Sequence, residues 1–330
     1  MEQSRRNPMA MARARHALTQ AGLDPSVELV AASSVTNEVW LTPTHVVRVN
    51  RRPNQRLRRE AILGPGLPAE IGYPLVVAYG GRLGADWLVV RRVPGEVLSR
   101  CWPSMSVAQR RDAIRQLAAK LRRLHRTPGP ADLPRIDAPQ MLRSDTLSPV
   151  MSLLVALDQA RALDHVDRGL IDDAEQMVFD LTPAIEPFDG DYLIHGDLTF
   201  ENILWDGERI TAILDFEWAR TAPNDLELDV LLRFCCFPQL HVAPDYRHET
   251  HARDYADVPW WLADDYPELF SHPRQLDRLL LYSIAYDVRD LMSAPPRSAV
   301  ELDDPHHAVN RLRATVQRRS HLDMLDTAVV

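Results

Sequence analysis

Three polar residues, each next to an apolar run, have the types and the spacing that phosphoryl transfer needs. Asp197 belongs to a His-Gly-Asp sequence, Asn202 follows after four intervening residues, and Asp215 ends the next apolar run. Phosphoryl transfer to a hydroxyl needs one carboxylate that orients the hydroxyl and accepts its proton. It also needs an amide and a second carboxylate on the metal ions that bridge the phosphates. We therefore predict that Asp197 is catalytic and that Asn202 and Asp215 bind metal.

The same residues have a purely structural alternative. Asp197 and Asn202 could be turn residues, because Asp and Asn side chains form local hydrogen bonds that favour turns. The third residue, Asp215, stands in register with them and favours the catalytic interpretation.

Two groups of histidines suggest a metal site elsewhere in the chain. Neither group has the closed spacing with Cys that a structural zinc site shows, so we do not expect a structural metal there. The two groups are His241, His248 and His251, and Asp303, Asp304, His306 and His307.

The whole chain has the composition of an ordinary globular protein. Its 330 residues can bury one large core or two modest ones. No apolar stretch reaches the roughly 18 residues of a membrane span, and the basic N-terminus does not resemble a secretory signal. The three cysteines include the adjacent pair Cys235 and Cys236, a poor disulfide framework that favours a cytoplasmic setting. A formal net charge of −8 argues against a nucleic-acid partner.

The elements that must position these residues change in kind along the chain. Alternating apolar patterns and turn signals predict a small, mostly antiparallel sheet with one inserted helix at 54–63, preceded by a helix at 9–21. After Pro94-Gly95 the pattern becomes helical, so we expect two lobes, 1–93 and 94–330. The segment 238–273 reads as irregular. The predicted strands are 27–32, 37–41, 45–49, 74–79 and 87–92, and the later helices are 106–126, 147–162, 167–182, 225–236, 274–293 and 306–320.

This order of elements and motifs resembles the aminoglycoside phosphotransferase family of small-molecule kinases. The resemblance covers roughly residues 25 to 295, and its most specific segments are His195–Trp205 and Ile213–Trp218. Leu117–His125 and Pro223–Leu226 match two further family patterns. The resemblance implies an α+β, two-lobe, protein-kinase-like fold, with a small antiparallel-sheet N-lobe that binds the nucleotide. The mostly helical C-lobe would carry the catalytic residues and bind the acceptor.

The resemblance also assigns residues to a nucleotide, ATP or GTP, and to Mg²⁺. Arg48 would touch the α- and β-phosphates, with Glu60 as its ion-pair partner. The loop 33–37 would cover the phosphates, the strand 87–93 would read the adenine through its backbone, and the ring of His195 would brace the catalytic loop. The nucleotide-binding residues implied in this way are Arg48, Glu60, Ser33, Ser34, Asn37, Arg91 and Val93.

Two features of the nucleotide site depart from the family pattern. Arg48 stands where Lys is commonest, and Arg is planar and bidentate where Lys is a point charge. No glycine occurs between Gly22 and Gly64, although glycines let a phosphate loop approach its ligand closely. Ser33 and Ser34 offer hydroxyls instead.

The acceptor site must lie beside Asp197, walled by the C-terminal helices. Acidic side chains there would attract ammonium groups, and Trp and Tyr would stack on a ring or sugar. The alternative is a solvated acidic surface over a packed aromatic core. The candidates are Asp229, Trp260, Trp261, Asp264, Asp265, Tyr266, Asp287 and Asp290.

We therefore expect a phosphotransferase that moves the γ-phosphoryl group of ATP or GTP to a hydroxyl of a small molecule. The first expectation is an antibiotic, with aminoglycosides ahead of nucleoside, macrolide and peptide antibiotics, which would make the protein a resistance enzyme. A metabolite kinase of the choline or amino-sugar type, a regulatory pseudokinase and a protein kinase are the alternatives. We expect no nucleic-acid or membrane partner, and both a monomer and a homodimer stay open.

Overall fold

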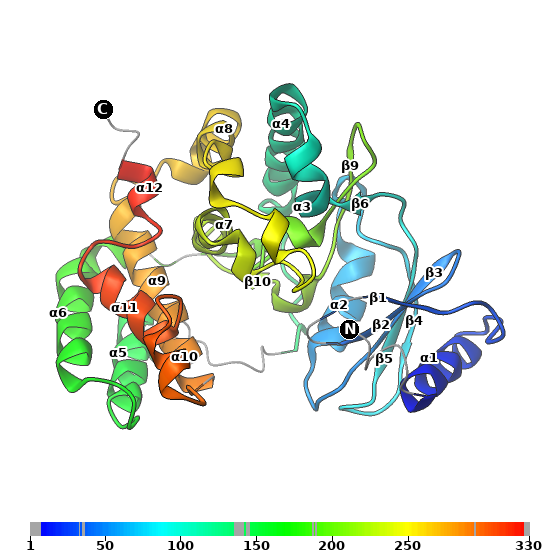
Figure 1. The fold of residues 1–330 in the computed structure, drawn as a ribbon, viewed down its shortest axis with the longest axis horizontal. Coiled ribbons are helices and arrows are strands. Elements are labelled where there is room, and N and C mark those ends of the chain that lie inside the picture. The colour runs from blue at the N-terminus through cyan, green and yellow to red at the C-terminus, as the bar shows by residue number, and fades with distance from the viewer. Residues whose placement is uncertain are drawn as a thin grey trace.

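The N-terminal part of the chain is an antiparallel sheet covered by one helix on each face. The computed structural model describes residues 8–32, 34, 37–134, 142, 146–186, 188, 190–293 and 295–326. Within them the sheet has the order β1-β2-β3-β5-β4, and helix α1 lies on its outer side in Figure 1. The strands are β1 (Val30–Ala32), β2 (Glu38–Leu41), β3 (His45–Val49), β4 (Val76–Gly80) and β5 (Trp87–Arg91).

Alternation along the strands explains why two helices can cover this sheet. Val47 and Val89 pack with α1 (Pro8–Gln20) in one apolar cluster. Leu88 and Val90, which point to the other face, pack with Leu57 of α2 (Arg56–Leu63). Because both faces are covered, β5 is buried along most of its length.

The C-terminal part is mostly helical. After β5 the chain crosses to β6 (Glu96–Val97), which pairs with β8 (Ile203–Trp205), and β8 pairs with β9 (Ile210–Ile213). The lobe boundary predicted at 93/94 falls between β5 and β6 and stays a prediction. The helices are α3 (Leu98–Cys101), α4 (Val107–Leu124), α5 (Pro149–Ala160), α6 (Arg168–Ile185), α7 (Leu226–Cys236), α8 (Val258–Asp265), α9 (Gln275–Ser293), α10 (Ala299–Asp303), α11 (Ala308–Val316) and α12 (Asp323–Asp326).

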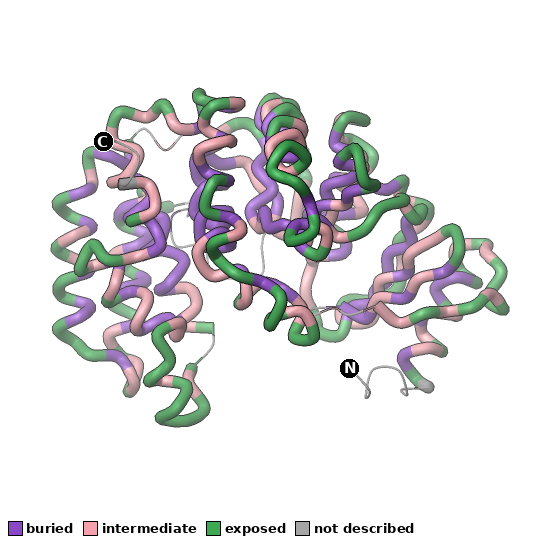
Figure 2. Tube along the Cα trace, turned by 45° about the horizontal axis from the view of Figure 1, so that its top comes forward, coloured by how far each residue is buried: buried purple, intermediate pink, exposed green. Residues whose placement is uncertain are grey.

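Helix α9 forms the centre of this part, with α5, α6, α7 and α11 around it. Its residues are buried almost continuously from Arg278 to Val288. In Figure 2, buried residues line the inner sides of the helices and exposed residues follow the outer turns. The predicted α+β fold is therefore confirmed.

The predicted elements differ from the observed ones mainly at their ends. Helix α6 continues past Pro183 to Ile185, where the prediction stopped at 182. Helix α11 starts later than predicted because the side chain of His307 caps it by accepting the N–H of Val309. The segment expected to be irregular, 238–273, contains the helix α8. None of the described helices is both long enough and apolar enough to span a membrane.

Candidate active site

A rigid loop between β7 (Leu193–Ile194) and β8 carries Asp197. The ring of His195 is fully buried and lies between two backbone groups: Nε2 is 2.7 Å from the carbonyl oxygen of Leu214, and Nδ1 accepts the N–H of Asp197 at 3.3 Å. The Asn202 amide donates to the carbonyl oxygen of Asp197 at 2.9 Å. His195 is thus placed to brace the loop, as the resemblance implied.

Glycine is the residue type that the backbone requires at position 196, beside Asp197. Its φ is 78°, in the left-handed region, and a Cβ would lie 2.6 Å from the carbonyl oxygen of Trp218. Any side chain at this position would displace the turn that carries Trp218 and so disturb the position of Asp197.

Glu227, which sequence reasoning missed, holds the same loop from behind. Its carboxylate accepts the N–H of His195 at 2.6 Å and that of Gly196 at 3.0 Å. Burial opposes its ionisation, but the hydrogen bond and charge of His125 and the charge of His195 hold the pKa of Glu227 below its usual value. The signal that could have found it is its position directly after the matched segment Pro223–Leu226.

Arg48 lies at the centre of a second group, which joins the sheet to the helical part. Its guanidinium pairs with Glu60 of α2, and its Nη2 is 3.0 Å from Asp215 Oδ1 and 3.4 Å from Glu217 Oε2. Glu60 also accepts the backbone N–H of Phe216 at 2.8 Å. The structure therefore brings three of the predicted residues together and adds Glu217. We call these four residues the nucleotide-side cluster.

Crowding of carboxylates changes the ionisation of this cluster. Burial, partly offset by Arg48, raises the pKa of Glu60 to about 8, with Asp215 and Glu217 adding to the increase. Burial and the charge of Asp215 raise the pKa of Glu217 to about 7. Arg56 partly compensates, because its Nη1 is 3.3 Å from Glu217 Oε1. Asp215 itself adopts a left-handed backbone, with φ at 63°.

The other predicted nucleotide residues are more dispersed. The Asn37 amide reaches the nucleotide-side cluster and donates to Glu217 Oε2 at 3.4 Å. Ser34 is partly buried, and Ser33 lies outside the described residues. On the strand expected to read the adenine, the N–H of Arg91 is bonded to Leu75. The backbone groups offered to a base along this strand would therefore start near Val93.

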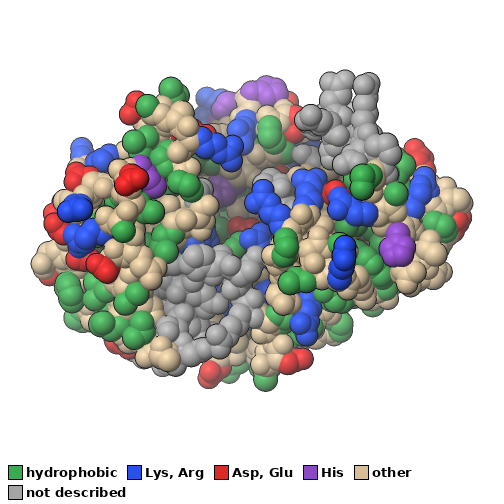
Figure 3. Space-filling view, turned by 90° about the horizontal axis from the view of Figure 1, so that it is seen from below, with side chains coloured by type: hydrophobic (Ala, Val, Ile, Leu, Met, Phe, Trp, Pro, Cys, Tyr) green, Lys and Arg blue, Asp and Glu red, His purple; other side chains and the backbone are tan. Residues whose placement is uncertain are grey.

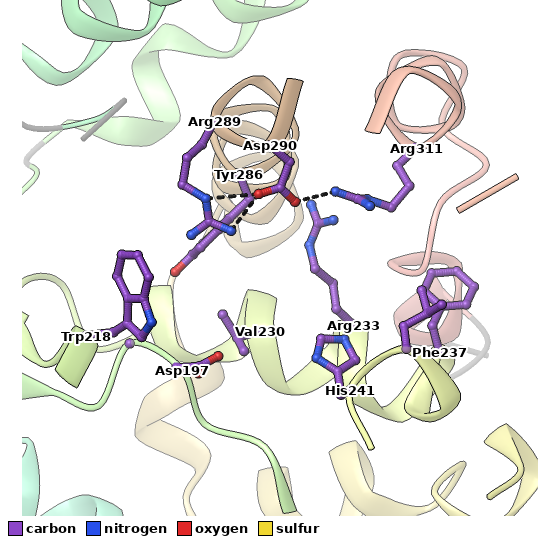
Figure 4. A pocket seen from close by; sticks show the side chains of 12 residues that line it. Asp197, Trp218, Val230, Arg233, Phe237, His241, Tyr286, Arg289, Asp290 and Arg311 are labelled. Atoms are coloured by element: carbon purple, nitrogen blue, oxygen red, sulfur yellow. Dashed lines mark hydrogen bonds and ion pairs between the residues drawn. The ribbon is translucent and has the colours of Figure 1, made fainter. Parts of the chain in front are cut away.

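A cavity of about 280 Å³ opens beside Asp197. In Figure 3 this face of the molecule has a hollow with Lys and Arg side chains gathered around it. Figure 4 shows that its walls come from the Asp197 loop, the Trp218 turn, α7, α9 and α11, with three arginines among the lining side chains. The lining residues include Asp197, Trp218, Arg233, Phe237, His241, Tyr286, Arg289, Asp290 and Arg311.

Of the eight acceptor candidates, Asp290 alone lines this cavity. Asp229 and Asp287 are fully buried beneath it, each 2.8 Å from a nitrogen of Arg233. Both carboxylates form ion pairs with Arg233 inside the protein, where α7 packs against α9. The residues away from the cavity are Asp229, Trp260, Trp261, Asp264, Tyr266 and Asp287, together with Asp265.

The aromatic candidates belong to a different contact. Helix α8 packs against α4, and Arg111 of α4 bonds the carbonyl oxygen of Trp261 at 3.0 Å and pairs with Asp264 at 3.3 Å. Tyr266, just after α8, lies 3.2 Å from the ring of His125. The cluster of acidic and aromatic residues is thus a packed face with ion pairs, which is the alternative that the sequence left open.

The side chain of Asp197 faces the cavity in an unusual electrostatic setting. Burial, with the charges of Asp215 and Glu217, raises its pKa to about 8, and Arg289 opposes this increase. A carboxylate that binds a proton near neutral pH is suited to accept one from a hydroxyl. The site can therefore combine a proton acceptor at Asp197, a guanidinium at Arg48 that could bind a phosphate group, and a cavity for a second substrate.

The donor set fits a magnesium ion that is held partly by a nucleotide. The Asn202 amide uses its nitrogen on Asp197, which leaves its oxygen for an ion, and Asp215 offers a carboxylate nearby in the chain. Mg²⁺ is usually bound by one or two protein oxygens together with phosphates. The described residues contain no group of three His, Cys, Asp or Glu side chains placed to hold a metal ion.

Comparison with known proteins gives a family model and several related folds. The model of the phosphotransferase enzyme family matches residues 28–261, more than half of the chain. No curated protein sequence matches this chain.

Solved structures resemble the whole chain in fold. A choline/ethanolamine kinase family protein from Mesorhizobium loti superposes with a TM-score of 0.62 at 16% identity, covering 97% of this chain and 99% of its own. A thermostable aminoglycoside phosphotransferase APH(4)-Ia, in complex with ADP and hygromycin B, gives 0.59 at 17%, covering 92% and 97%. A GDP and kanamycin complex of an APH(2″) enzyme gives 0.60 at 16%, covering 92% and 96%.

Proposed function

The chain belongs to the phosphotransferase enzyme family of small-molecule kinases, as its sequence pattern predicted, and we propose that it transfers the γ-phosphoryl group of ATP or GTP to a hydroxyl group of a small molecule. The observation that carries this proposal is the position of Asp197. Its carboxyl group faces a cavity on one side and shares its electrostatic environment with Asp215 and Glu217 on the other. A hydroxyl in the cavity would therefore lie between a proton acceptor and the phosphates.

In this proposal the protein contributes positioning and charge. Asp197 orients the acceptor hydroxyl and takes its proton as the new oxygen–phosphorus bond forms. Arg48, held by Glu60, would contact the α- and β-phosphates through the N–H groups that Glu60, Asp215 and Glu217 leave free. The loop of His195, Gly196 and Glu227 keeps Asp197 in place, so the carboxylate does not need to reorganise during the reaction.

The nucleotide and metal assignments follow from the same geometry. ADP and GDP occur in the related structures named above, and we propose ATP or GTP with Mg²⁺ here. Asn202 and Asp215 would hold the ion, which supplies positive charge to neutralise the transferring phosphoryl group. Ser33, Ser34 and Asn37 would cover the phosphates, and the chain from Arg91 to Val93 would contact the base.

The acceptor class has two candidates from the sequence. An antibiotic, an aminoglycoside first, gains support from relatives crystallised with hygromycin B and kanamycin. A metabolite kinase gains support from the choline/ethanolamine kinase family fold. In either case we propose a cytoplasmic enzyme, because the three cysteines are free thiols. A monomer and a homodimer both stay open.

Product formation tests this proposal directly. The full chain is incubated with Mg²⁺, ATP or GTP and hydroxylated compounds that include aminoglycosides, macrolides, nucleosides, choline, amino sugars and hydroxy acids. Mass spectrometry then detects addition of a phosphoryl group. We expect Asp197→Asn to lower kcat by roughly 10²–10⁴-fold, because it removes the proton acceptor.

Asp158→Asn is the matched control, since this Asp lies on α5 with its side chain 81% exposed. If nucleotide binds but no compound yields more product than the Asp197→Asn background, the pseudokinase alternative replaces the enzyme. A labelled polypeptide in place of a labelled small molecule would instead favour a protein kinase.

A further inference from the structure

Among the described residues, the carboxylates around the acceptor cavity are already paired. Asp290 Oδ1 accepts two bonds from Arg289, at 3.1 and 2.8 Å, and Asp290 Oδ2 pairs with Arg311. The charges of Arg289 and Arg311 outweigh burial and lower the pKa of Asp290. Apart from Asp197, which has to hold the reacting hydroxyl, no unpaired carboxylate lines the cavity. An ammonium group would therefore find no free anionic partner there.

Two of the arginines on the cavity wall are paired as well. Arg233 bonds Asp229 and Asp287, and Arg311 bonds Asp287 and Asp290. Arg233, Arg289 and Arg311 line the cavity, and of the described residues only Asp197 and Asp290 add carboxylates to the same wall. The carboxylates that balance Arg233 are Asp229 and Asp287, which lie fully buried behind the lining. A molecule in the cavity therefore meets three guanidinium groups, and that of Arg289 keeps one nitrogen without a partner among the described residues.

Arg289 has both spare donors and a fixed position. It uses Nε and Nη2 on Asp290, and its Nη1 bonds none of the described residues. Its guanidinium carbon lies 4.7 Å from the centre of the Tyr286 ring and 5.7 Å from that of Trp218. Figure 4 shows it on the wall that α9 contributes, held on one edge by Asp290. A guanidinium held in this way loses little freedom when it binds an anion.

We propose that the acceptor carries an oxyanion, a carboxylate or a phosphate, in addition to its hydroxyl, and that Nη1 of Arg289 binds it. The inference rests on the proposed function, because it names the class of molecule that this kinase site takes. The acceptor would span the cavity with its anionic group at Arg289 and its hydroxyl at Asp197. Trp218 and Phe237 would cover its apolar surface.

The size of the cavity supports a small acceptor. Its volume of about 280 Å³ lies just below the roughly 300–1,000 Å³ of typical ligand sites. A single sugar ring or an open-chain hydroxy acid fits such a volume better than an aminoglycoside of several rings. Charge and size therefore point to the same class of acceptor.

Binding measurements with four related six-carbon probes test this inference without turnover. Calorimetry compares D-glucose, D-glucosamine, D-gluconate and glucose 6-phosphate, which are neutral, cationic, carboxylate-bearing and phosphate-bearing. We expect at least one of the two anions to bind about tenfold or more tightly than D-glucose, because charge-assisted bonds to Arg are strong. The better of the two anions identifies the carboxylate or the phosphate as the recognised group.

Two substitutions on α9 locate the effect. Arg289→Gln keeps the length of the side chain and removes its charge, and we expect it to abolish the preference for the anion. Arg289→Lys should restore part of it. Arg274→Gln, at the residue just before α9, is the control, since its partly exposed guanidinium pairs with Asp277 and Arg274 is not among the lining residues of the cavity. Unchanged nucleotide affinity in all three variants excludes a folding defect.

The outcomes separate this inference from the proposed function. Tightest binding of D-glucosamine, equal binding of all four probes, or an anion preference that survives in Arg289→Gln overturns the inference. If phosphorylated product forms best from cationic acceptors, the function stands and the inference falls. If the anions bind through Arg289 but no hydroxylated compound is ever phosphorylated, the inference stands and the function falls.

Discussion

The two sides of Asp197 have opposite charge patterns. In the nucleotide-side cluster one guanidinium, that of Arg48, faces three carboxylates, and the pKa values of Glu60 and Glu217 are raised. On the acceptor side three guanidiniums line the cavity, and the pKa of Asp290 is lowered. The first side gathers carboxyl groups, which suit a metal ion, and the second presents cationic groups that suit an anion. A single carboxyl group, that of Asp197, stands between them.

This difference teaches that charge counts along the sequence do not show what a cavity presents. The chain is acidic overall, with a net charge of −8, and several of its acidic residues cluster in the helices around the cavity. Those carboxylates form ion pairs with buried or partly buried arginines, so the charged groups that remain available on the acceptor side are mainly guanidiniums. An acidic composition here does not indicate a cationic substrate.

The largest expected effect lies on the nucleotide side. Asp215→Ala removes the carboxylate proposed to hold Mg²⁺, which is worth several kcal/mol of transition-state stabilisation, so turnover should fall by roughly 10³-fold or more. Metal-dependent nucleotide binding, measured by calorimetry with and without Mg²⁺, should be lost as well. Asn202→Ala should weaken metal use less severely. Full activity of Asp215→Ala would sink the metal assignment.

The next effect concerns the buried ion pairs of Arg233 beneath the acceptor cavity. Arg233→Ala leaves Asp229 buried without its guanidinium partner and leaves Asp287 with Arg311 alone, so the free energy of unfolding should fall by about 3–5 kcal/mol. Arg289→Ala breaks a partly exposed pair and should cost only about 1 kcal/mol or less. Urea unfolding of both variants measures the difference. Equal effects would mean that the two arginines play the same structural role.

A third test uses pH, because the two sides should respond in opposite directions. On the acceptor side, burial, with the charges of Arg233 and Arg311, lowers the pKa of His241 to about 4. Between that value and its ordinary pKa, roughly 6.5, the unfolded chain binds more protons at His241 than the folded chain does. This contribution to stability is therefore present above about pH 6.5 and is lost as the pH falls towards 4.

Glu60 has the reverse sign. Its folded pKa of about 8 lies above its unfolded value, so the folded protein holds the extra proton. The stability that Glu60 contributes is present below its ordinary pKa of roughly 4.3 and is lost as the pH rises through about 8. The free energy of unfolding should be measured from pH 4.5 to 8 for the parent and both variants. In His241→Gln it should fall less steeply than in the parent as the pH is lowered. In Glu60→Gln it should fall less steeply as the pH is raised. Parallel curves for both variants and the parent would contradict this contrast.

The smallest expected effect is at α8, which the sequence suggested as a wall of the acceptor site. Asp264→Ala removes a carboxylate whose side chain is 70% exposed and paired with Arg111. Both KM for the acceptor and stability should change little, the latter by about 0.5 kcal/mol or less. A large rise in the acceptor KM, measured in the same assay as for Arg289→Gln, would return α8 to the acceptor site.

Local patterns predicted most of the elements and the segments that carry the site. The five strands, α4, α7 and α9 occur within a few residues of where alternating and helical apolar patterns placed them. Errors at Pro183 and His307 concern helix ends, where capping and neighbouring contacts compete with the local pattern. Glu217 and Glu227 lay inside or next to recognised motifs, yet nothing local to the sequence indicated that both would turn inward.

By itself the sequence determined the order of the elements and predicted the chemistry at Asp197, Asn202 and Asp215, because spacing within a loop and its flanking strands is a local property. Only the tertiary structure decided which charges face the acceptor. Asp287 and Asp290 lie one helical turn apart on α9, yet Asp287 is sealed beneath Arg233 and Asp290 reaches the cavity wall. The packing of α7 and α11 against α9 sets that depth, and such packing joins residues far apart in the chain, beyond the reach of any local pattern.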